Sequence, residues 1–561
     1  MPNTTHDLLP RQVADAYVDA LVELDPITGT FLGEARSARR LPDYSPAGAR
    51  ARADLARATL DRLAAAELMP GAERDIERRC GRLLRERLTA GLAVHDTGEH
   101  LRAVSNIEGP LHAVREIFTM MPADTEEDWA AIAERLRAVP AALDSFRASL
   151  AEGLDQKLPG GPRQVSTVLG QLEQWIGTGG GWFAEFAAAG PEALRAELDK
   201  SAAAATGGLA VLRDWLRDVY APAVEGSPDV VGRERYAVWS RYWNGTDLDL
   251  DEAYAFGWSE FHRVLGEMRE AAQKVLPGAV TPWEALAHLD VHGRHIEGVE
   301  EVRVWLQKLM DDTIEALDGT HFDLAEPVKR VESRIAPPGG ASAPYYSEPS
   351  QDFSRPGRTW LPTMGETRFP EYDLVSTWYH EGVPGHHLQL AQWVHMADRL
   401  SRYQTTVGGV SANTEGWALY AERLMDELGF LTDPARRLGY LDAQMMRSTR
   451  VIVDIGMHLG LEIPAHSPFH PGERWTPELA QEFFGLHSGR PADVVESEMT
   501  RYLGMPAQAI GYKLGERAWL AGREAARAAH GAAFDAKAWH MAALSQGSLG
   551  LDDLVAELSV L

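Results

Sequence analysis

The stretch YHEGVPGHHLQ, residues 379–389, decides how the chain is interpreted, because it sets a Pro-Gly pair among three histidines and a glutamate. His380 and Glu381 begin the pattern His-Glu-x-x-His, in which two histidines on one helical face bind a metal and the glutamate acts as a base. Pro384 stands where the second histidine belongs. Proline lacks an N–H and clashes with the preceding turn, and Gly385 tolerates backbone angles that other residues avoid, so a regular helix is not expected here.

The spacing of the histidines shows why an unbroken helix could not bring two of them to one metal ion. On an unbroken helix His386 would lie about 240° around the axis from His380, so the two could not chelate one ion. His387 would return to the same face about 10.5 Å farther along the axis. We therefore expect the helix to bulge at the Pro-Gly pair, which brings His386 to the place of the missing ligand. A helix start with incidental histidines is the alternative.

A third ligand is expected from a separate helix in SANTEGWALYAERLM, residues 411–425. Ser, Asn and Thr are typical capping residues, so Glu415 is expected in the first turn of this helix. Its carboxylate would complete a set of two histidines and one glutamate, as in catalytic zinc sites. Glu422 lies two turns farther on and is expected as a surface or supporting group. The predicted metal ligands are thus His380, His386 and Glu415.

The rest of the chain is dominated by apolar residues at three- and four-residue spacings, which is typical of amphipathic helices. Such patterns occupy residues 51–69, 125–154, 184–222, 249–278, 434–464 and 506–531. The run RTWLPTM, residues 358–364, is β-prone and is expected as an edge strand beside a cleft, with a loop as the alternative. The sequence predicts a mostly α fold with at most a small β-sheet.

Composition restricts the partners of this 561-residue chain. Its 55 basic and 82 acidic residues give a net charge of −27, which disfavours nucleic acid and anionic membranes as partners. The N-terminal residues lack the pattern of a signal peptide, and no run of about 18 apolar residues occurs. The single cysteine, Cys80, is expected in the core and fits a reducing compartment. We therefore expect a cytoplasmic protein.

The motifs resemble those of the bacterial family called domain of unknown function 885, in which His-Glu-x-x-Pro-Gly-His is often followed by a second His and x-Gln. The matching residues are His380, Glu381, Pro384, Gly385, His386, His387 and Gln389. Further matches are residues 21–33, 414–422, 446–458 and 501–516, so the resemblance covers nearly the whole chain. Ala507 departs from the pattern, because the family commonly has Gly there. The family motif favours His386 over His387 as the metal ligand.

That family is in turn similar to the mostly helical gluzincin metallopeptidases, such as thimet oligopeptidase and angiotensin-converting enzyme. In these enzymes substrate enters a deep groove between two helical lobes. The resemblance implies a single metallopeptidase-like domain over residues 1–561, with an N-terminal helical lobe over 1–335 and the metal site and C-terminal helices in 336–561. It also implies one zinc ion per chain and a peptidase that acts on short peptides.

Further site residues follow from this interpretation. Glu381 would take a proton from a metal-bound water. Tyr512 is the candidate to stabilise the oxyanion, because related gluzincins use a C-terminal tyrosine; a buried structural tyrosine is the alternative. Arg447, Arg450 and Lys513 are candidates to bind a substrate carboxylate, with interhelical salt bridges as the alternative.

Remaining polar residues of the matched segments receive weaker roles. His387 and Gln389 would orient substrate or support the ligands. Asp454 and His458, spaced i and i+4, are expected to be structural.

Two other functions stay open from the sequence. A metal-dependent amide hydrolase acting on a non-peptide metabolite would use the same ligands and the same base. A non-catalytic binding protein could keep the fold without turnover, although it would have little reason to retain Glu381 together with all three ligands. Neither nucleic acid nor a membrane is expected as a partner under any of these interpretations.

Overall fold

The computed structural model describes residues 8–337 and 343–561. Helices hold 67% of the chain and strands 4%, which confirms a mostly α fold with only small sheets. The long periodic segments become long helices; residues 125–154, for example, form α6 (Glu126–Asp155) behind a capping box, in which Thr125 and Asp128 bind each other's backbone N–H. In the described part of the chain, no helix is long and apolar enough to cross a membrane.

The chain divides into two compact units that are each discontinuous in sequence. Unit 1 comprises residues 1–73, 88–238 and 497–506, and unit 2 comprises residues 74–87, 239–496 and 507–561. These limits differ from the boundary after residue 335 that the sequence suggested. Three helices contribute residues to both units: α4 (Asp75–Asp96), α11 (Gly232–Asn244) and α21 (Ala492–Gly504).

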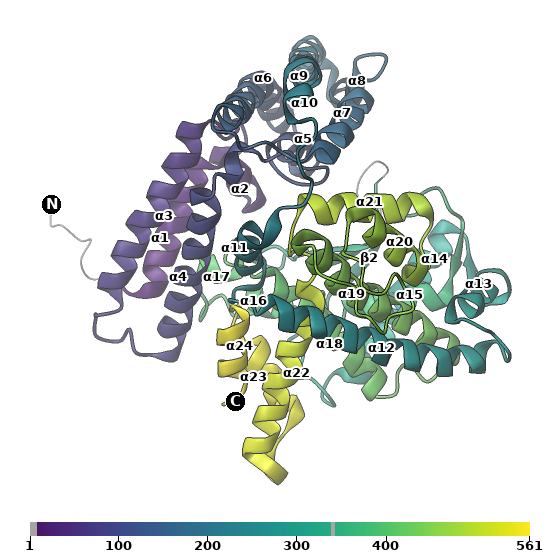
Figure 1. Ribbon diagram of the computed structural model, residues 1–561. Helices are drawn as coiled ribbons and strands as arrows, with labels where there is room; N and C mark the ends of the chain where they lie inside the picture. Colours follow the sequence, from purple (N-terminus) through teal and green to yellow (C-terminus); the bar gives the residue numbers. More distant parts are fainter. Residues whose placement is uncertain (1–7, 338–342) are drawn as a thin grey trace. The chain divides into compact units, whose positions relative to one another are not determined.

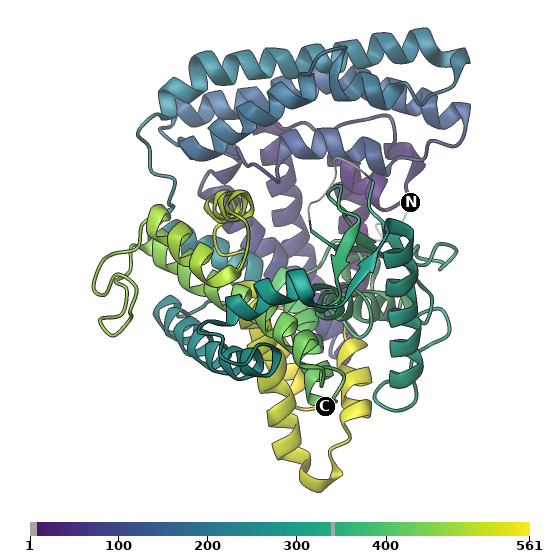
Figure 2. The ribbon, with the colours of Figure 1, turned by 90° about the vertical axis from the view of Figure 1, so that its right-hand side faces the viewer.

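Unit 1 is an all-helical body in which α6 runs along α9 and α1 packs on α3 (Figures 1 and 2). Its core gathers apolar side chains from α5 to α10, including Phe118, Leu136 and Phe183, each at most 1% exposed. Besides α6, its own helices are α1 (Pro10–Leu24), α2 (Pro26–Phe31), α3 (Pro46–Ala66), α5 (Pro110–Met120), α7 (Pro162–Ile176), α8 (Gly181–Ala187), α9 (Arg195–Trp215) and α10 (Ala221–Val224).

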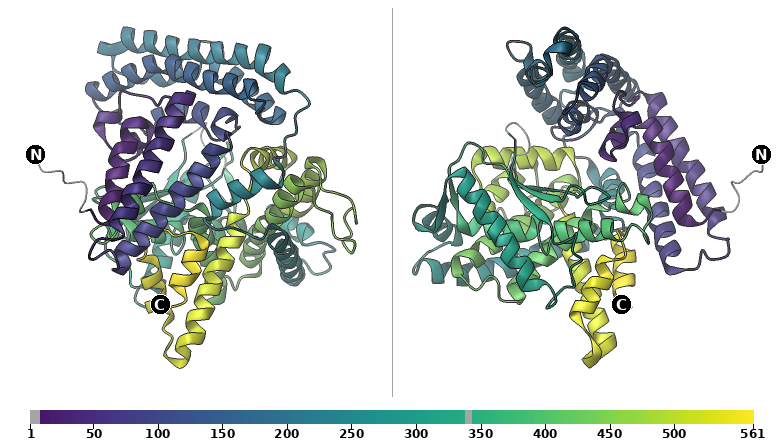
Figure 3. Two further views of the ribbon diagram at one scale, coloured as in Figure 1. Left: turned by 60° about the vertical axis from the view of Figure 1, so that its left-hand side comes forward. Right: turned by 180° about the vertical axis from the view of Figure 1, so that it is seen from behind.

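Unit 2 surrounds the long helix α19 (Pro434–Leu459), which packs against α12, α15 and α20. Cys80, which α4 contributes to this unit, is fully buried, as expected. The other helices are α12 (Leu250–Val275), α13 (Pro282–His292), α14 (Val299–Leu317), α15 (Glu371–Glu381), α16 (His386–His395), α17 (Arg402–Thr405), α18 (Ser411–Glu427), α20 (Pro477–Ser488), α22 (Gly511–His530), α23 (Ala536–Leu544) and α24 (Leu551–Leu558). Figure 3 shows the C-terminal helices of this unit in yellow.

In the described part of unit 2, five short strands form two small sheets. They are β1 (His295–Glu297), β2 (Val331–Ile335), β3 (Tyr345–Ser347), β4 (Gly357–Leu361) and β5 (Arg368–Pro370). β1 pairs antiparallel with β5, while β4 lies between parallel β2 and antiparallel β3. The expectation of an edge strand at residues 358–364 is therefore wrong, because both backbone edges of β4 are paired: Thr359 faces Ser333 on β2 and Tyr346 on β3.

A close helix crossing fixes the frame of the candidate site. α18 and α22 meet at Gly416, where an added Cβ would lie only 2.4 Å from the Cα of Gly515. Only glycine leaves room for backbones this close. The crossing brings the helix that carries Glu415 against the helix that carries Tyr512.

Candidate metal centre

The Pro-Gly pair separates two helices instead of forming a bulge within one. α15 ends at Glu381 and α16 begins at His386. The turn between them requires glycine at position 385, because a Cβ there would lie 2.0 Å from the carbonyl oxygen of His380. Trp417 of α18 donates its indole N–H to the carbonyl oxygens of Pro384 (2.9 Å) and Gly385 (3.1 Å), which holds the turn in place.

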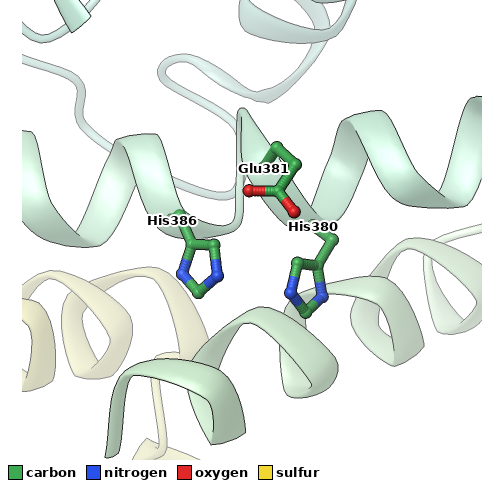
Figure 4. Close-up of side chains that lie close together, drawn as sticks. All are labelled: His380, Glu381 and His386. Carbon is green, nitrogen blue, oxygen red and sulfur yellow. The ribbon is translucent and has the colours of Figure 1, made fainter. Parts of the chain in front are cut away.

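This turn brings the two predicted histidine ligands together. The ring centroids of His380 and His386 are 4.7 Å apart, and Figure 4 shows both rings projecting into the same space from either side of the turn, with the Glu381 carboxylate close by. Ligand atoms of His380, Glu381 and His386 lie within 4.8 Å of one another. All three residues are buried, with exposures of 3%, 8% and 8%.

Glu415 completes the set from α18. Its Oε2 lies 3.4 Å from Nε2 of His380 and 3.5 Å from Nε2 of His386. Around a tetrahedral zinc ion with bonds of about 2.0–2.1 Å, neighbouring ligand atoms are about 3.3–3.4 Å apart. Among the described residues, this buried Oε2 has no hydrogen-bond partner. Glu415 Oε2 is therefore unpaired and lies at about the spacing of a tetrahedral zinc site from both imidazole nitrogens.

The helix that carries Glu415 begins differently from the sequence expectation. Its N-cap is Val410, without a side-chain cap, and Glu415 lies in the second turn. The expected capping residue Asn413 instead accepts a hydrogen bond from Gln389 (3.0 Å) and donates one to the carbonyl oxygen of Leu549 (3.1 Å). Asn413 therefore ties α18 to its neighbours, and Gln389 is a buried link between α16 and α18.

Glu422 supports His380 from behind. It is 1% exposed, so a surface position is excluded. Its Oε1 lies 2.8 Å from Nδ1 of His380, and Ser376 donates a hydrogen bond of 2.6 Å to its Oε2. A carboxylate that accepts the Nδ1 proton fixes the ring orientation and leaves Nε2 as the metal-binding atom.

The charges of the cluster act strongly on one another. Burial by itself would lower the pKa of His380, but Glu415 and Glu422 raise it to about 9. Burial acts to raise the pKa of Glu415, yet the two histidines hold it well below its usual value. At Glu381 burial prevails over the neighbouring positive charges and raises the pKa. A raised pKa suits a carboxylate that must accept a proton near neutral pH.

His387 is excluded as a ligand, because both of its ring nitrogens are used elsewhere. Nδ1 lies 3.0 Å from the hydroxyl of Tyr346 on β3, and Nε2 lies 2.7 Å from the carbonyl oxygen of Val328. The residue is fully buried, and burial lowers its pKa to about 4. His387 thus anchors α16 to β3, and it is not placed to orient substrate.

Lys513 forms the interhelical salt bridge that the sequence left open. It is fully buried, and its Nζ lies 2.5 Å from Glu516, 3.0 Å from Glu260 of α12 and 2.8 Å from the side-chain oxygen of Gln444. Its three donors therefore have three partners, and it is not free to bind a substrate carboxylate.

Tyr512, Arg447 and Arg450 lie beside the cluster. The Tyr512 ring stacks on His380 with centroids 6.5 Å apart. The guanidinium carbons of Arg447 and Arg450 lie 5.8 and 5.1 Å from the centroid of the same ring. Tyr512 therefore lies next to the candidate ligand His380, and Arg447 and Arg450 lie next to the ring of Tyr512.

Asp454 and His458 are fully buried on α19, consistent with a structural role. The Asp454 carboxylate accepts a hydrogen bond of 2.9 Å from the backbone N–H of Ala507. Ala507 has a φ of 66°, in the left-handed region. The preference of the family for Gly at this position has its physical reason here, because glycine adopts this conformation at little cost.

Glu348, which follows β3, was not among the site residues predicted from the sequence. Its charge acts on His386.

The protein is thus mostly helical and carries a cluster of two histidines and two glutamates, His380, His386, Glu381 and Glu415. More specifically, the chain belongs to the family described as bacterial protein of unknown function (DUF885), which matches residues 26–558. Comparison with curated proteins finds no match.

Two solved structures resemble the chain over 98% of its length. One is described as a putative lipoprotein from Colwellia psychrerythraea (TM-score 0.84, 22% identity, 98% of that chain). The other is described as a putative lipoprotein of unknown function from Shewanella oneidensis (TM-score 0.75, 17% identity, 100% of that chain). At these identities the likeness establishes the fold alone.

Proposed function

We propose that the protein is a zinc-dependent metallopeptidase that hydrolyses short peptides. One observation carries the proposal: Glu415 Oε2 lies 3.4 and 3.5 Å from the Nε2 atoms of His380 and His386, close to the spacing of neighbouring ligands around zinc, and it has no other partner among the described residues. The fourth corner would be open to water, as in catalytic zinc sites.

The chemistry is divided between the metal and Glu381. Zinc at this place would supply positive charge that lowers the pKa of a bound water toward about 7. Glu381 accepts the proton of the attacking water and passes it to the leaving amine. Its burial supports this role, because a desolvated carboxylate holds a proton more readily than an exposed one.

In this proposal the hydroxyl of Tyr512 donates a hydrogen bond to the developing oxyanion. Its ring stacks on His380, and two guanidinium groups lie within 6 Å of it, those of Arg447 (5.8 Å) and Arg450 (5.1 Å). Neighbouring positive charge favours donation of its hydroxyl proton toward an oxygen that becomes negative.

The proposal extends to the gluzincin-like class, whose members take peptides into a deep groove between two helical lobes, and to a cytoplasmic location. A structure with a bound peptide tests the first part. Cell fractionation tests the second, and an acylated N-terminus or recovery in the membrane fraction would contradict it.

Zinc content and peptide cleavage test the function together. Elemental analysis is expected to find about one zinc per chain in the wild type and none in Glu415→Ala. Glu366→Ala, which changes an exposed glutamate before β5, is the matched control and should keep its zinc. Glu381→Gln should also keep zinc but lose about 10²–10⁴-fold in peptide cleavage, the usual contribution of a general base. A protein that binds no supplied zinc, or a Glu381→Gln variant of full activity, would contradict the proposal.

A further inference from the structure

Arg447 carries a positive charge that the protein does not neutralise by direct contact. It is half-buried on α19, and its buried Nε has no hydrogen-bond partner within the described ranges. Its Nη1 group donates a hydrogen bond of 3.3 Å to the carbonyl oxygen of Ala443. No described carboxylate lies within ion-pair distance of it. Desolvated charges are costly unless they are paired, so this guanidinium is prepared for an anion that the chain does not supply.

Arg447 lies close to the residues that would carry out the proposed reaction. Its charge acts on both Glu381 and Glu422, and its guanidinium lies over the Tyr512 ring that stacks on His380. An anion bound by Arg447 would therefore lie on the side of the cluster formed by Glu381 and Tyr512.

Glu348 is the opposite case, a carboxylate without a cation. It is exposed, and in the described part of the chain no hydrogen bond or ion pair reaches it. It follows the end of β3 directly and lies two residues after Tyr346, whose hydroxyl is 3.0 Å from Nδ1 of His387 on α16. The Glu348 charge acts on His386, and Arg355 is near but outside ion-pair distance.

We propose that these two residues bind the charged ends of the substrate: Glu348 the α-ammonium group on the His386 side, and Arg447 the α-carboxylate on the Glu381 side. The substrate class is then short peptides with both ends free, and the two charges set the direction in which the peptide lies. This inference rests on the proposed peptidase function. A blocked peptide would leave one of the two charges without a partner, which is the strongest form of discrimination that a polar site achieves.

The test compares four forms of one short peptide: free, N-acetylated, C-amidated and blocked at both ends. We expect kcat/KM of the zinc-loaded wild type to fall about tenfold to a hundredfold with each block, the usual effect of losing a charged hydrogen bond. Glu348→Gln should remove the discrimination against the acetyl group and keep that against the amide. Arg447→Gln should do the reverse, and Arg447→Lys should restore part of the preference for the free carboxylate.

A second readout separates binding from catalysis. Calorimetry with zinc-loaded Glu381→Gln protein should show the same ranking of the four peptides in Kd. Glu366→Gln and Arg269→Gln change exposed charges elsewhere in unit 2 and should leave both rankings as in the wild type.

The outcomes distinguish this inference from the function on which it rests. Equal cleavage of all four forms overturns the inference and leaves the peptidase standing. Discrimination that survives in Glu348→Gln or Arg447→Gln overturns the assignment of that residue. Zinc-loaded protein that neither binds nor cleaves any form overturns the peptidase function, and the inference falls with it.

Discussion

Two buried polar clusters of unit 2 differ in whether the protein itself satisfies the central group of each. Around Lys513, three ammonium donors meet oxygens of Glu516, Gln444 and Glu260 at 2.5–3.0 Å. In the cluster of His380, His386 and Glu415, two buried atoms, Glu415 Oε2 and His386 Nδ1, have no hydrogen-bond partner among the described residues.

The contrast helps to tell a structural cluster from a functional one. Buried polar groups are normally paired, and a satisfied central charge stabilises one packing of the core. An unpaired carboxylate oxygen that lies at metal-binding distance from two imidazole nitrogens points to a partner from outside the chain. Lys513 and Glu415 were both candidate site residues in the sequence, and only this comparison separates them.

Removing the satisfied ammonium group of Lys513 should produce the largest loss of stability. Lys513→Met takes the nearest cation from the buried Glu516, while Glu260 keeps its pair with Arg263, and we expect a cost of about 3–5 kcal/mol in the free energy of unfolding. Urea denaturation monitored by tryptophan fluorescence measures it. Lys308→Met is the matched control: Lys308 pairs with Asp312 at the surface of α14, so its loss should leave the free energy of unfolding nearly unchanged. Equal losses in both variants would contradict the distinction.

Removing the metal should affect the other cluster alone. A ligand that binds only the folded state stabilises it by about 4 kcal/mol at a thousandfold excess over its Kd. We therefore expect a chelator to lower the stability of the zinc-loaded wild type by up to about this amount. Lys513→Met should respond to the chelator like the wild type, whereas Glu415→Gln should not respond. A response of Glu415→Gln equal to that of the wild type would exclude this glutamate as a ligand.

Glu422 tests whether the residue behind a ligand tunes the cluster. Glu422→Gln removes the charge that holds the Nδ1 proton of His380. We expect zinc affinity to fall about 10- to 100-fold, the usual effect of losing such a partner. Competition with a chelating dye measures the affinity. Glu427→Gln, at the end of the same helix, breaks contacts with Arg423 and Arg523 and should leave zinc affinity unchanged.

The sequence predicts what depends on local pattern. The apolar periodicity of residues 249–278 and 434–464 anticipates α12 and α19 within a few residues, because one face of each helix must be buried. The grouping of His380, His386 and Glu415 was also predictable, since their residue types and the helix break are visible in the chain.

What depends on partners far along the chain was not predictable. β4 was expected at an edge, because the pairing of β2 and β3 on its two sides cannot be inferred from its own residues. Glu422 was expected as a surface or a supporting group, and its own segment could not decide between the two, because its partner His380 lies 42 residues away. Glu348 gave no signal for the same reason: its significance comes from the position of β3 beside α16.

Two adjacent residues, His386 and His387, show the same contrast as the two clusters. In the sequence, only the family motif distinguishes the one that is expected as a metal ligand. His387 has both nitrogens satisfied, as Lys513 has its donors, whereas His386 turns Nε2 toward Glu415 and leaves Nδ1 without a described partner. Tyr346→Phe removes the hydroxyl partner of His387, so unfolding should become easier by about 0.5–1.5 kcal/mol, the net value of one hydrogen bond. Zinc content should stay at the wild-type level, since no ligand changes. Loss of zinc on this substitution would mean that His387, held by β3, determines the metal geometry as strongly as His386 does.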